Sequence, residues 1–347
     1  MKRPVVVKLG SSLVAGAGGR VRRSLVRARA REIAALVGGG TPVCVVSSGA
    51  IALGLPRLGL TGRPRSLPRL QAASALGQAR LQRIWDEALG REGLAAAQVL
   101  LTAADVADRA AYVNARNTLA ALFALGAVPV VNENDATATD EITFGDNDAL
   151  AAQVAILVRA RLLVLLTEVA GVYSCAPGTP GAELLPSGAD TGAAELGAGS
   201  PGGKGGMQSK VLAAELAASA GIPTVIAAGA GADVLAAIVA GEPRGTRFQP
   251  GDRSPSAFKL WLLHGKPVAG RLHVDDGARQ ALTDDGASLL AVGVARVEGR
   301  FEPGDAVEVV GSDGAAFAKG IAGAAAAELA GRPRGVEAVH RDRLVLY

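Results

Sequence analysis

The segment 132–148 concentrates polar residues that could bind a charged ligand. It holds six carboxylates and no Lys or Arg, the carboxylates being Glu133, Asp135, Asp140, Glu141, Asp146 and Asp148. Their mutual repulsion opposes packing unless a cation or a positively charged ligand lies nearby. A buried strand is predicted at 127–131 and a helix from about Asn147, with Asp146 as its N-cap. Ligands of α/β proteins bind between strand ends and helix starts, so we predict a functional loop here, the alternative being a solvated acidic loop.

Lysine is scarce in this chain, which has seven Lys and 29 Arg. Lys8, Lys204 and Lys210 stand among glycines, and the compact ammonium group of Lys is poorly replaced by the broad guanidinium group of Arg. We interpret these three lysines as required by their sites, the alternative being chance retention.

Histidine occurs only at 264, 273 and 340. The first 263 residues therefore hold neither a Ser-His or Cys-His nucleophile pair nor a His-ligated metal site.

Two turns after predicted buried strands could hold an anion. The apolar residues 4–9 end in Gly10 and two serines, and the apolar residues 42–46 end in a second Ser- and Gly-containing turn at 47–50. Backbone N–H groups and hydroxyls in such turns bind phosphate or carboxylate groups. For Ser48 an ordinary N-cap role is the simpler alternative.

A glycine-rich segment precedes a helix predicted at 207–220. Residues 202–206 are Gly-Gly-Lys-Gly-Gly, and Lys210 follows one turn inside the helix. Glycines before a helix N-terminus, with a lysine close by, suit a polyphosphate. The segment is not a Walker A loop, because the pattern Gly-x-x-x-x-Gly-Lys-Ser/Thr is absent. Another predicted strand ends in Thr167 and Glu168, which places a nucleotide-sized opening at that strand end.

Apolar strand patterns alternate with helical patterns through the first 250 residues. Strands are predicted at 4–9, 42–46, 96–101, 128–131, 162–166 and 222–227, and helices at 24–37, 67–89, 111–125, 147–159 and 207–220. This alternation predicts an α/β fold with a mostly parallel sheet sandwiched by helices. Gly, Asp, Arg and Pro cluster at 249–255, and short strands predicted at 271–274, 291–298, 305–310 and 316–321 indicate a small β-rich domain. We expect one domain at 1–250, a linker at 251–265 and a second domain at 266–347.

Charge and hydropathy argue against two classes of protein. The first 255 residues carry 25 basic and 20 acidic residues, and the remainder 11 basic and 12 acidic. A near-neutral tail lacks the electrostatic footprint of a strong nucleic-acid binder. Without an apolar run that could span a bilayer or a signal-peptide core, we expect a cytoplasmic protein with no membrane association.

The chain has two cysteines, Cys44 and Cys175. Both lie in or beside apolar runs, so we expect buried free thiols and no disulfide.

In order and spacing, the motifs resemble those of the glutamate 5-kinases in the amino-acid kinase family. They are Val-Lys8-Leu-Gly10, Ser48-Gly49-Ala50, Asn132-Glu-Asn-Asp135, Gly145-Asp-Asn147-Asp148, Leu-Leu-Thr167 and Gly-Gly-Met207-x-Ser-Lys210. The tail resembles the PUA domain, an RNA-associated fold, through Val274-Asp275-x-Gly277-Ala278 and Gly299-x-Phe301-x-x-Gly304-Asp305-x-Val307. Together the two resemblances cover nearly the whole chain.

The resemblance implies ATP- and Mg²⁺-dependent phosphorylation of the γ-carboxylate of L-glutamate to γ-glutamyl phosphate. It further implies the first step of proline biosynthesis, feedback inhibition by proline and a homo-oligomer. The implied catalytic residues are Lys8, Asp148 and Lys210, and the implied glutamate-binding residues are Ser48, Gly49, Ala50, Asp135 and Asn147. The implied nucleotide-binding residues are Lys8, Gly10, Thr167, Glu168, Lys204, Gly205, Gly206, Met207, Gln208, Ser209 and Lys210. No residue is assigned to a metal, and the chain departs from the family at Glu168 and Lys204, where Asp and Thr are common.

The chemistry of such a reaction agrees with a histidine-free catalytic domain. A carboxylate acceptor with a pKa of about 4.3 is ionised at pH 7 and needs no general base. Catalysis then requires positioning and cationic stabilisation of the transferred phosphoryl group. One alternative is a kinase for another small acid or for a nucleoside monophosphate, although the latter would need Arg rather than an acidic loop. Another is an RNA-binding protein with a degenerate kinase fold, which the retention of Lys8, Asp148 and Lys210 disfavours.

Overall fold

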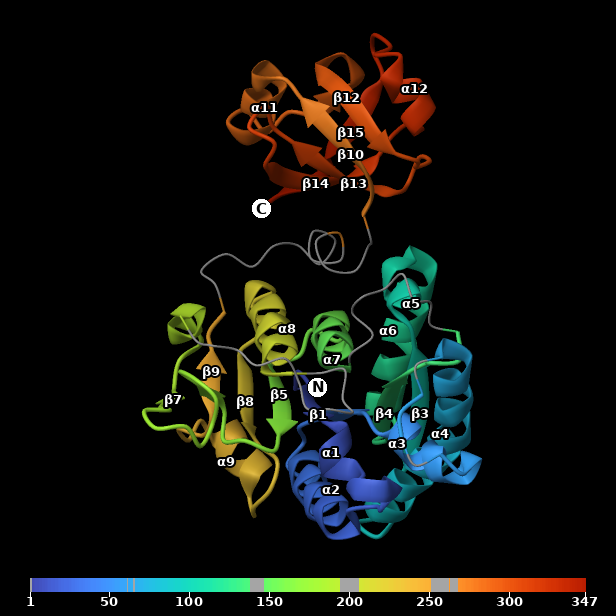
Figure 1. Ribbon diagram of the computed structural model, residues 1–347, viewed down its shortest axis with the longest axis vertical. Helices are drawn as coiled ribbons and strands as arrows, with labels where there is room; N and C mark the ends of the chain where they lie inside the picture. Colours follow the sequence, from blue (N-terminus) through green and yellow to red (C-terminus); the bar gives the residue numbers. More distant parts are fainter. Residues whose placement is uncertain are drawn as a thin grey trace. The chain divides into compact units, whose positions relative to one another are not determined.

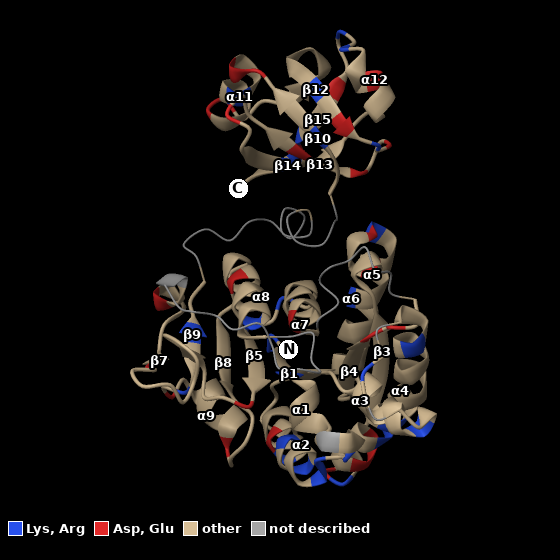
Figure 2. Ribbon diagram, viewed as in Figure 1, with Lys and Arg blue, Asp and Glu red and all other residues tan. Residues whose placement is uncertain are grey.

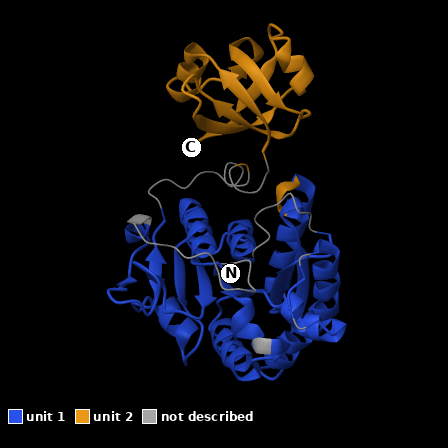
Figure 3. Ribbon diagram, viewed as in Figure 1, with its two compact units in different colours: residues 1–105, 109–254 blue, residues 106–108, 255–347 orange. Residues whose placement is uncertain are grey.

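The chain divides into two compact units (Figure 3). The computed structural model describes residues 2–60, 62–64, 66–137, 147–193, 206–250, 262 and 268–347. The first unit comprises Met1–Asp105 and Arg109–Ser254, and the second comprises Val106–Asp108 and Pro255–Tyr347. Apart from Leu262, the predicted linker 251–265 lies outside the described residues. The domain boundaries drawn from the sequence stay a prediction.

The first unit contains a seven-stranded sheet with the order β3-β4-β2-β1-β5-β8-β9. Its strands are β1 (Val5–Leu9), β2 (Val43–Ser47), β3 (Ala96–Leu101), β4 (Val128–Glu133), β5 (Leu162–Thr167), β8 (Thr224–Ala228) and β9 (Thr246–Phe248). All neighbouring strands pair in parallel except β9, which is antiparallel to β8. The predicted α/β fold with a mostly parallel sheet is therefore confirmed.

Helices cover both faces of this sheet (Figure 1). The path β1 to β2 to β3 crosses the sheet in one direction, and the path β3 to β4 to β5 to β8 returns. Because parallel crossovers are right-handed, the two paths place their helices on opposite faces. The first face carries α1 (Ser11–Val14), α2 (Arg23–Gly38), α3 (Ala50–Gly54), α4 (Leu67–Gly90) and α9 (Val234–Ala240). The second face carries α6 (Arg109–Ala124), which follows α5 (Ala103–Ala107), and α7 (Asn147–Leu157) and α8 (Met207–Ser219).

Alternation along the strands decides which side chains face which layer of helices. In β1 the odd-numbered residues belong to the core shared with α2 and α4. Lys8 therefore points to the opposite layer, towards α7 and α8. In β4 the even-numbered residues 128 and 130 belong to the α2 and α4 core, so Asn132 points towards α4. Lys8, near the end of β1, thus faces the layer of α7 and α8, whereas Asn132, near the end of β4, faces the layer of α4.

The second unit contains a six-stranded sheet with the order β11-β15-β14-β13-β10-β12. Its strands are β10 (Val268–Val274), β11 (Leu289–Leu290), β12 (Val294–Gly299), β13 (Ala306–Val310), β14 (Ala316–Ala322) and β15 (Glu337–Leu346), and its helices are α11 (Asp276–Thr283) and α12 (Ala326–Ala330). The predicted β-rich domain is confirmed, with strands β10, β12, β13 and β14 close to their predicted positions. Strand β15 was not predicted, because the polar run 340–343 interrupts its apolar alternation.

The two cysteines differ from expectation in one respect. Both are free, and Cys44 is fully buried, which raises the pKa of its thiol. Cys175 is only partly buried, so the prediction of a buried thiol is wrong there. It follows the short hairpin strand β6 (Val172–Tyr173), which pairs with β7 (Leu184–Leu185), and its Sγ lies 3.2 Å from the Oγ1 of Thr179. Within the described ranges, no helix has the length and apolar character needed to cross a membrane.

Candidate active site

Two lysines from distant segments meet on one carboxylate. Lys8, on β1, donates a hydrogen bond to the Oδ1 of Asp148, and Lys210, in the first turn of α8, donates to its Oδ2 at 3.0 Å. Asp148 is fully buried, and the two lysines are 2% and 7% exposed. The three catalytic candidates from the sequence are therefore in direct contact.

The helix starts of α7 and α8 hold this cluster in place. Asp148 lies in the first turn of α7, where the backbone dipoles favour a negative charge. The hydroxyl of Ser209 lies 3.0 Å from the Oδ2 of Asp148 and 2.9 Å from the carbonyl oxygen of Gly206, the N-cap of α8. Met207 and Gln208 complete the first turn of α8, whereas Lys204 and Gly205 lie outside the described residues.

The electrostatics of the cluster favour an ionised Asp148 and a bound anion. Burial by itself raises the pKa of Asp148, but the charges of Lys8 and Lys210 and their hydrogen bonds outweigh it. The pKa of Asp148 therefore lies well below its ordinary value of 3.8. Within this trio, two ammonium groups face one carboxylate, which leaves one positive charge unbalanced. A negatively charged group that approaches the lysines would be attracted.

Asp135 and Asn147 lie around the end of β4, and Asn147 directly precedes Asp148 at the start of α7. The hydroxyl of Ser74, on α4, donates a hydrogen bond to the Oδ2 of Asp135 at 2.5 Å. The Oδ1 of Asn147 accepts from the backbone N–H of Glu133 at 3.3 Å, which ties the start of α7 to the end of β4. The remaining acids of the predicted loop, Asp140, Glu141 and Asp146, lie outside the described residues, and so does the predicted N-cap role of Asp146.

The turn after β2 ends at a glycine that its conformation requires. Gly49 has φ 120° and is the N-cap of α3, so the alternative N-cap role of Ser48 is wrong. The backbone N–H of Ser48 donates to the carbonyl of Leu9 at 3.1 Å, which joins this turn to the end of β1. Ala50 begins α3. The anion-binding turn predicted at 47–50 thus lies at the same sheet edge as Lys8.

Helices α3 and α4 cross with their backbones in contact. A Cβ on Gly77 would lie 1.8 Å from the carbonyl oxygen of Ala50, and a Cβ on Gly54 would lie 1.8 Å from that of Ala73. No residue with a Cβ fits at either position without moving a helix. The crossing therefore fixes the turn at 47–50 against α4, the helix that also holds Asp135 through Ser74.

Helix α4 contributes polar residues that were not predicted from the sequence. Ser74 binds Asp135, and the Oε1 of Gln78 accepts from the Nδ2 of Asn132 at 2.8 Å. The available signal was an i, i+4 polar pair on the otherwise apolar, inward face of a long amphipathic helix. The side-chain oxygen of Asn132 is buried and has no hydrogen-bond partner among the described residues.

The remaining candidates line the ends of β1 and β5. Gly10 is the N-cap of α1, and a Cβ there would lie 3.8 Å from the carbonyl oxygen of Leu166. Thr167 accepts at its backbone oxygen from the N–H of Gly229 at 2.7 Å, which links β5 to the segment after β8. Glu168 is mostly exposed, 3.6 Å from a guanidinium nitrogen of Arg22. These residues therefore lie at the ends of two neighbouring strands, β1 and β5.

Comparison with known proteins shows which family the chain belongs to. The family described as the amino acid kinase family matches residues 3–228, and the PUA domain matches residues 270–341. The glutamate 5-kinase of Paraburkholderia phymatum is 43% identical over 363 residues, covering 99% of this chain and 98% of that protein. The glutamate 5-kinase of Ralstonia nicotianae is 43% identical over 364 residues, covering 99% of this chain and 97% of that protein.

Two solved structures share the fold at lower identity. An isopentenyl phosphate kinase has a TM-score of 0.50 and 22% identity, and covers 71% of this chain and 99% of its own. A UMP kinase from Bacillus anthracis has a TM-score of 0.50 and 16% identity, and covers 73% of this chain and 98% of its own. These likenesses establish the fold alone. The family match and the 43% identity establish the family as well. The chain therefore belongs to the amino acid kinase family, its full-length relatives are glutamate 5-kinases, and its C-terminal part is a PUA domain.

Proposed function

We propose that this protein transfers the γ-phosphoryl group of ATP to the γ-carboxylate of L-glutamate, which yields γ-glutamyl phosphate and ADP. The observation that most supports this proposal is the buried cluster of Lys8, Asp148 and Lys210 in a chain 43% identical to a glutamate 5-kinase over 99% of its length. An anionic acceptor must approach an anionic phosphoryl group, so catalysis depends on cations and positioning. Two ammonium groups fixed on one ionised carboxylate meet that requirement.

In this proposal the three residues of the cluster have distinct roles. Lys8 and Lys210 contact the transferred phosphoryl group from two sides, since they reach Asp148 from β1 and from α8. Asp148 is a positioning residue, because each of its carboxylate oxygens accepts from one lysine. Its lowered pKa keeps it ionised at neutral pH, so both lysines keep their anchor throughout the reaction.

The acceptor is assigned to the ends of β2 and β4. The turn formed by Ser48, Gly49 and Ala50 offers N–H and hydroxyl donors to a glutamate carboxylate. Asp135 accepts from the glutamate ammonium group, and the hydrogen bond from Ser74 orients it for this role. Asn147, which is bonded to the end of β4, completes the acceptor site. All of these segments meet at the sheet edge that carries Lys8.

The nucleotide is assigned to the ends of β1 and β5 and to the start of α8. The proposed contacts are Gly10, Thr167, Glu168, Gly206, Met207, Gln208 and Ser209, with Lys204 and Gly205 added from the family resemblance. Among the residues that the structure describes, no group of three His, Cys, Asp or Glu side chains could hold a metal ion. Both carboxylate oxygens of Asp148 already accept from lysines. We assign Mg²⁺ to the substrate, as the MgATP complex, since this ion commonly binds through substrate phosphates.

A substrate comparison tests the proposed reaction against its rivals within the fold. ADP release is measured with glutamate, aspartate, N-acetylglutamate and UMP, with hydroxylamine present to trap an acyl phosphate as a hydroxamate. We expect glutamate to give the fastest ADP release and a matching yield of hydroxamate. Faster turnover with UMP would identify a nucleoside monophosphate kinase, and faster turnover with another acid would change the acceptor.

Replacing Asp135 by Asn should weaken glutamate binding selectively. The variant loses a charge-assisted contact worth about 1.5 to 3 kcal/mol, so the glutamate KM should rise roughly 10- to 150-fold. The ATP KM should change little, because Asp135 bonds Ser74 on the acceptor side. Asp86→Asn, at an exposed carboxylate of α4, is the matched control. A rise in the ATP KM with an unchanged glutamate KM would show that Asp135 faces the nucleotide.

Residues 1–255 alone should fold and retain glutamate-dependent ADP release. Every assigned contact precedes residue 211, and the seven-stranded sheet ends at Phe248. The measurement compares turnover of this fragment with that of the full chain, after circular dichroism has verified its folding. A soluble, folded fragment without turnover would refute independent activity of the first domain.

Several finer parts of the proposal rest on the family resemblance alone. They are the place of the reaction as the first step of proline biosynthesis, feedback inhibition by proline and a homo-oligomeric state. A cytoplasmic location is also part of the proposal. Inhibition is tested by titrating proline into the glutamate-dependent reaction, with D-proline as the control. A glutamate-competitive effect of L-proline alone would support it, and equal effects of both enantiomers would contradict it.

A further inference from the structure

A hollow lined by arginines lies on the outer side of α4. Its volume is about 400 Å³, and it is bounded by the start of α2, by the short helix η2 (Leu55–Leu58) and by α4. Four arginines line it, Arg23, Arg57, Arg80 and Arg83, against the single carboxylate of Glu87. Figure 2 shows Lys and Arg gathered on α2 and α4. Three separate elements thus bring positive charge to one hollow.

These four arginines have no counter-ion among the described residues. No ion pair or side-chain hydrogen bond joins any of them to another described residue. Elsewhere in the same unit arginines do pair, as Arg31 does with Glu92 at 3.6 Å. Like charges gathered around one hollow repel each other, and an anion placed between them removes the repulsion. The hollow therefore has the electrostatic character of an anion site.

The elements that carry the arginines are held by close packing. Gly19, with φ 70°, precedes α2, and a Cβ on it would lie 2.6 Å from the carbonyl oxygen of Ala52 and 2.8 Å from the Cγ of Pro56. This contact presses the segment before α2 against η2, the element of Arg57. On the other side, the glycine crossing with α3 fixes α4. The hollow is thus preformed rather than assembled by flexible loops.

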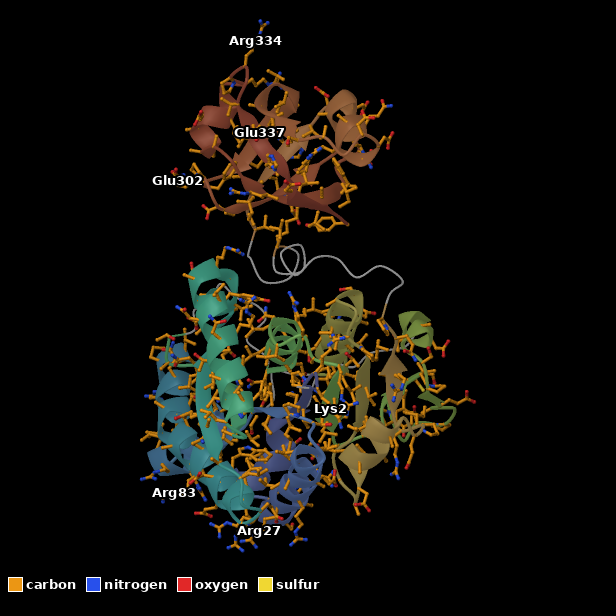
Figure 4. The ribbon with its side chains drawn as sticks, turned by 180° about the vertical axis from the view of Figure 1, so that it is seen from behind. Lys2, Arg27, Arg83, Glu302, Arg334 and Glu337 are labelled. Carbon is orange, nitrogen blue, oxygen red and sulfur yellow. The ribbon has the colours of Figure 1, made fainter. Side chains whose placement is uncertain are left out.

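The hollow is separate from the candidate active site. One face of α4 lines the hollow. It carries Leu76, Arg80, Arg83 and Glu87, which are three or four residues apart along the helix. Ser74, which binds Asp135, lies on the opposite face of α4. Figure 4 shows Arg83 on α4 and Arg27 on α2 extending outward from the surface of the first unit. A small adjoining hollow has both Arg23 and Arg27 in its lining.

The lining selects the chemistry of the ligand. Guanidinium groups bind phosphate through paired N–H donors, and Arg is preferred to Lys for such recognition. Val21, Leu76 and Ile84 add an apolar wall, which suits an organic part of the ligand. The volume of about 400 Å³ exceeds that needed for one phosphate and falls in the range of small-molecule sites, roughly 300 to 1,000 Å³. We propose that this hollow binds a small, multivalent, phosphate-bearing anion.

Calorimetric titration with inorganic triphosphate tests this site in the full chain. Because triphosphate also suits the lysine cluster, the titration uses a Lys210→Ala background, in which Lys8 still pairs with Asp148. The test variant adds Arg57→Ala and Arg83→Ala. The matched control adds Arg69→Ala and Arg91→Ala, which remove the same charge from exposed positions within and just after α4 that do not line the hollow. Circular dichroism verifies that each protein is folded.

We expect one equivalent of triphosphate to bind in the Lys210→Ala background. Affinity should fall at least about tenfold in the test variant and less than about twofold in the control, since the loss of charge-assisted contacts is local. If the test variant fails to fold, Arg57→Lys with Arg83→Lys should still lower affinity, because Lys lacks the paired donors. Absence of binding in the background, or equal losses in both Ala pairs, would overturn the proposal.

Size-exclusion chromatography adds a further outcome. A change of oligomeric state in the Arg57 and Arg83 variant, without triphosphate binding in the background, would mean that this face contacts another copy of the chain and would overturn the proposal. The inference does not depend on the proposed reaction, because binding is measured without turnover. A negative result therefore leaves the assignment of glutamate phosphorylation untouched.

Discussion

Replacing Lys210 by Ala should lower kcat by on the order of 10²-fold or more, with little change in the glutamate KM. The Nζ of Lys210 lies 3.0 Å from the Oδ2 of Asp148, and Lys8 bonds the other oxygen, so each lysine occupies its own side of the proposed phosphoryl site. Charge on the transferred group is spread over its oxygens in the transition state, and this is where a fixed cation acts. Lys8→Ala should have an effect of the same size for the same reason.

Arginine should rescue either lysine poorly. Lys8 and Lys210 are 2% and 7% exposed, and a planar guanidinium group needs more room than the ammonium group that now fills each position. Steady-state kinetics of Lys8→Ala, Lys8→Arg, Lys210→Ala and Lys210→Arg measure both effects. Lys2→Ala is the control, because its exposed ammonium group donates to the carbonyl of Gly39, outside the lysine cluster.

Two outcomes of this series would count against the proposal. Near-normal kcat in either Ala variant would remove that lysine from the catalytic site. Near-normal kcat in both Arg variants would contradict the interpretation that these lysines survive in an arginine-rich chain because a compact cation is required.

Replacing Asp148 by Asn should lower the free energy of unfolding of the first unit by about 3 to 5 kcal/mol, the usual cost of breaking a buried ion pair from one side. Asp148 is fully buried and accepts from two ammonium groups, which would lose their only shared counter-charge in this trio. Urea unfolding at neutral pH measures the change. Asp86→Asn, at an exposed position of α4, is the control and should cost little.

The pH dependence of this difference follows from the sign of the pKa shift. The folded protein holds the pKa of Asp148 below its ordinary value of 3.8, despite the opposing effect of burial, because of Lys8 and Lys210. Its stabilising contribution is therefore complete above pH 3.8 and is lost as the pH falls towards the folded pKa. The gap in unfolding free energy between the native protein and Asp148→Asn should narrow only below about pH 4. A gap that stays constant down to pH 2, or that narrows near neutral pH, would show that Asp148 is not held ionised by the lysines.

Local signals in the sequence sufficed for much of the fold and for the identity of many candidate residues. The strands of the first unit are continuous apolar runs because both faces of a parallel sheet are buried, so segments such as Val5–Leu9 and Leu162–Thr167 are recognisable without structural information. Gly49 marks a turn with positive φ, and lysine scarcity singled out Lys8 and Lys210. These features depend on a few neighbouring residues, which the sequence displays directly.

Other features depend on which distant segments pack together, and only the tertiary structure decided them. Asp148 stands in an acidic stretch without basic neighbours, yet its two counter-ions come from 140 residues before it and 62 residues after it. Ser74 meets Asp135 across 61 residues because α4 covers the end of β4. Strand alternation determines that Lys8 faces α7, but the position of α7 follows from the direction in which the chain crosses the sheet. Such contacts between layers leave no local spacing to detect, so the hydrogen-bond partners and distances came from the tertiary structure.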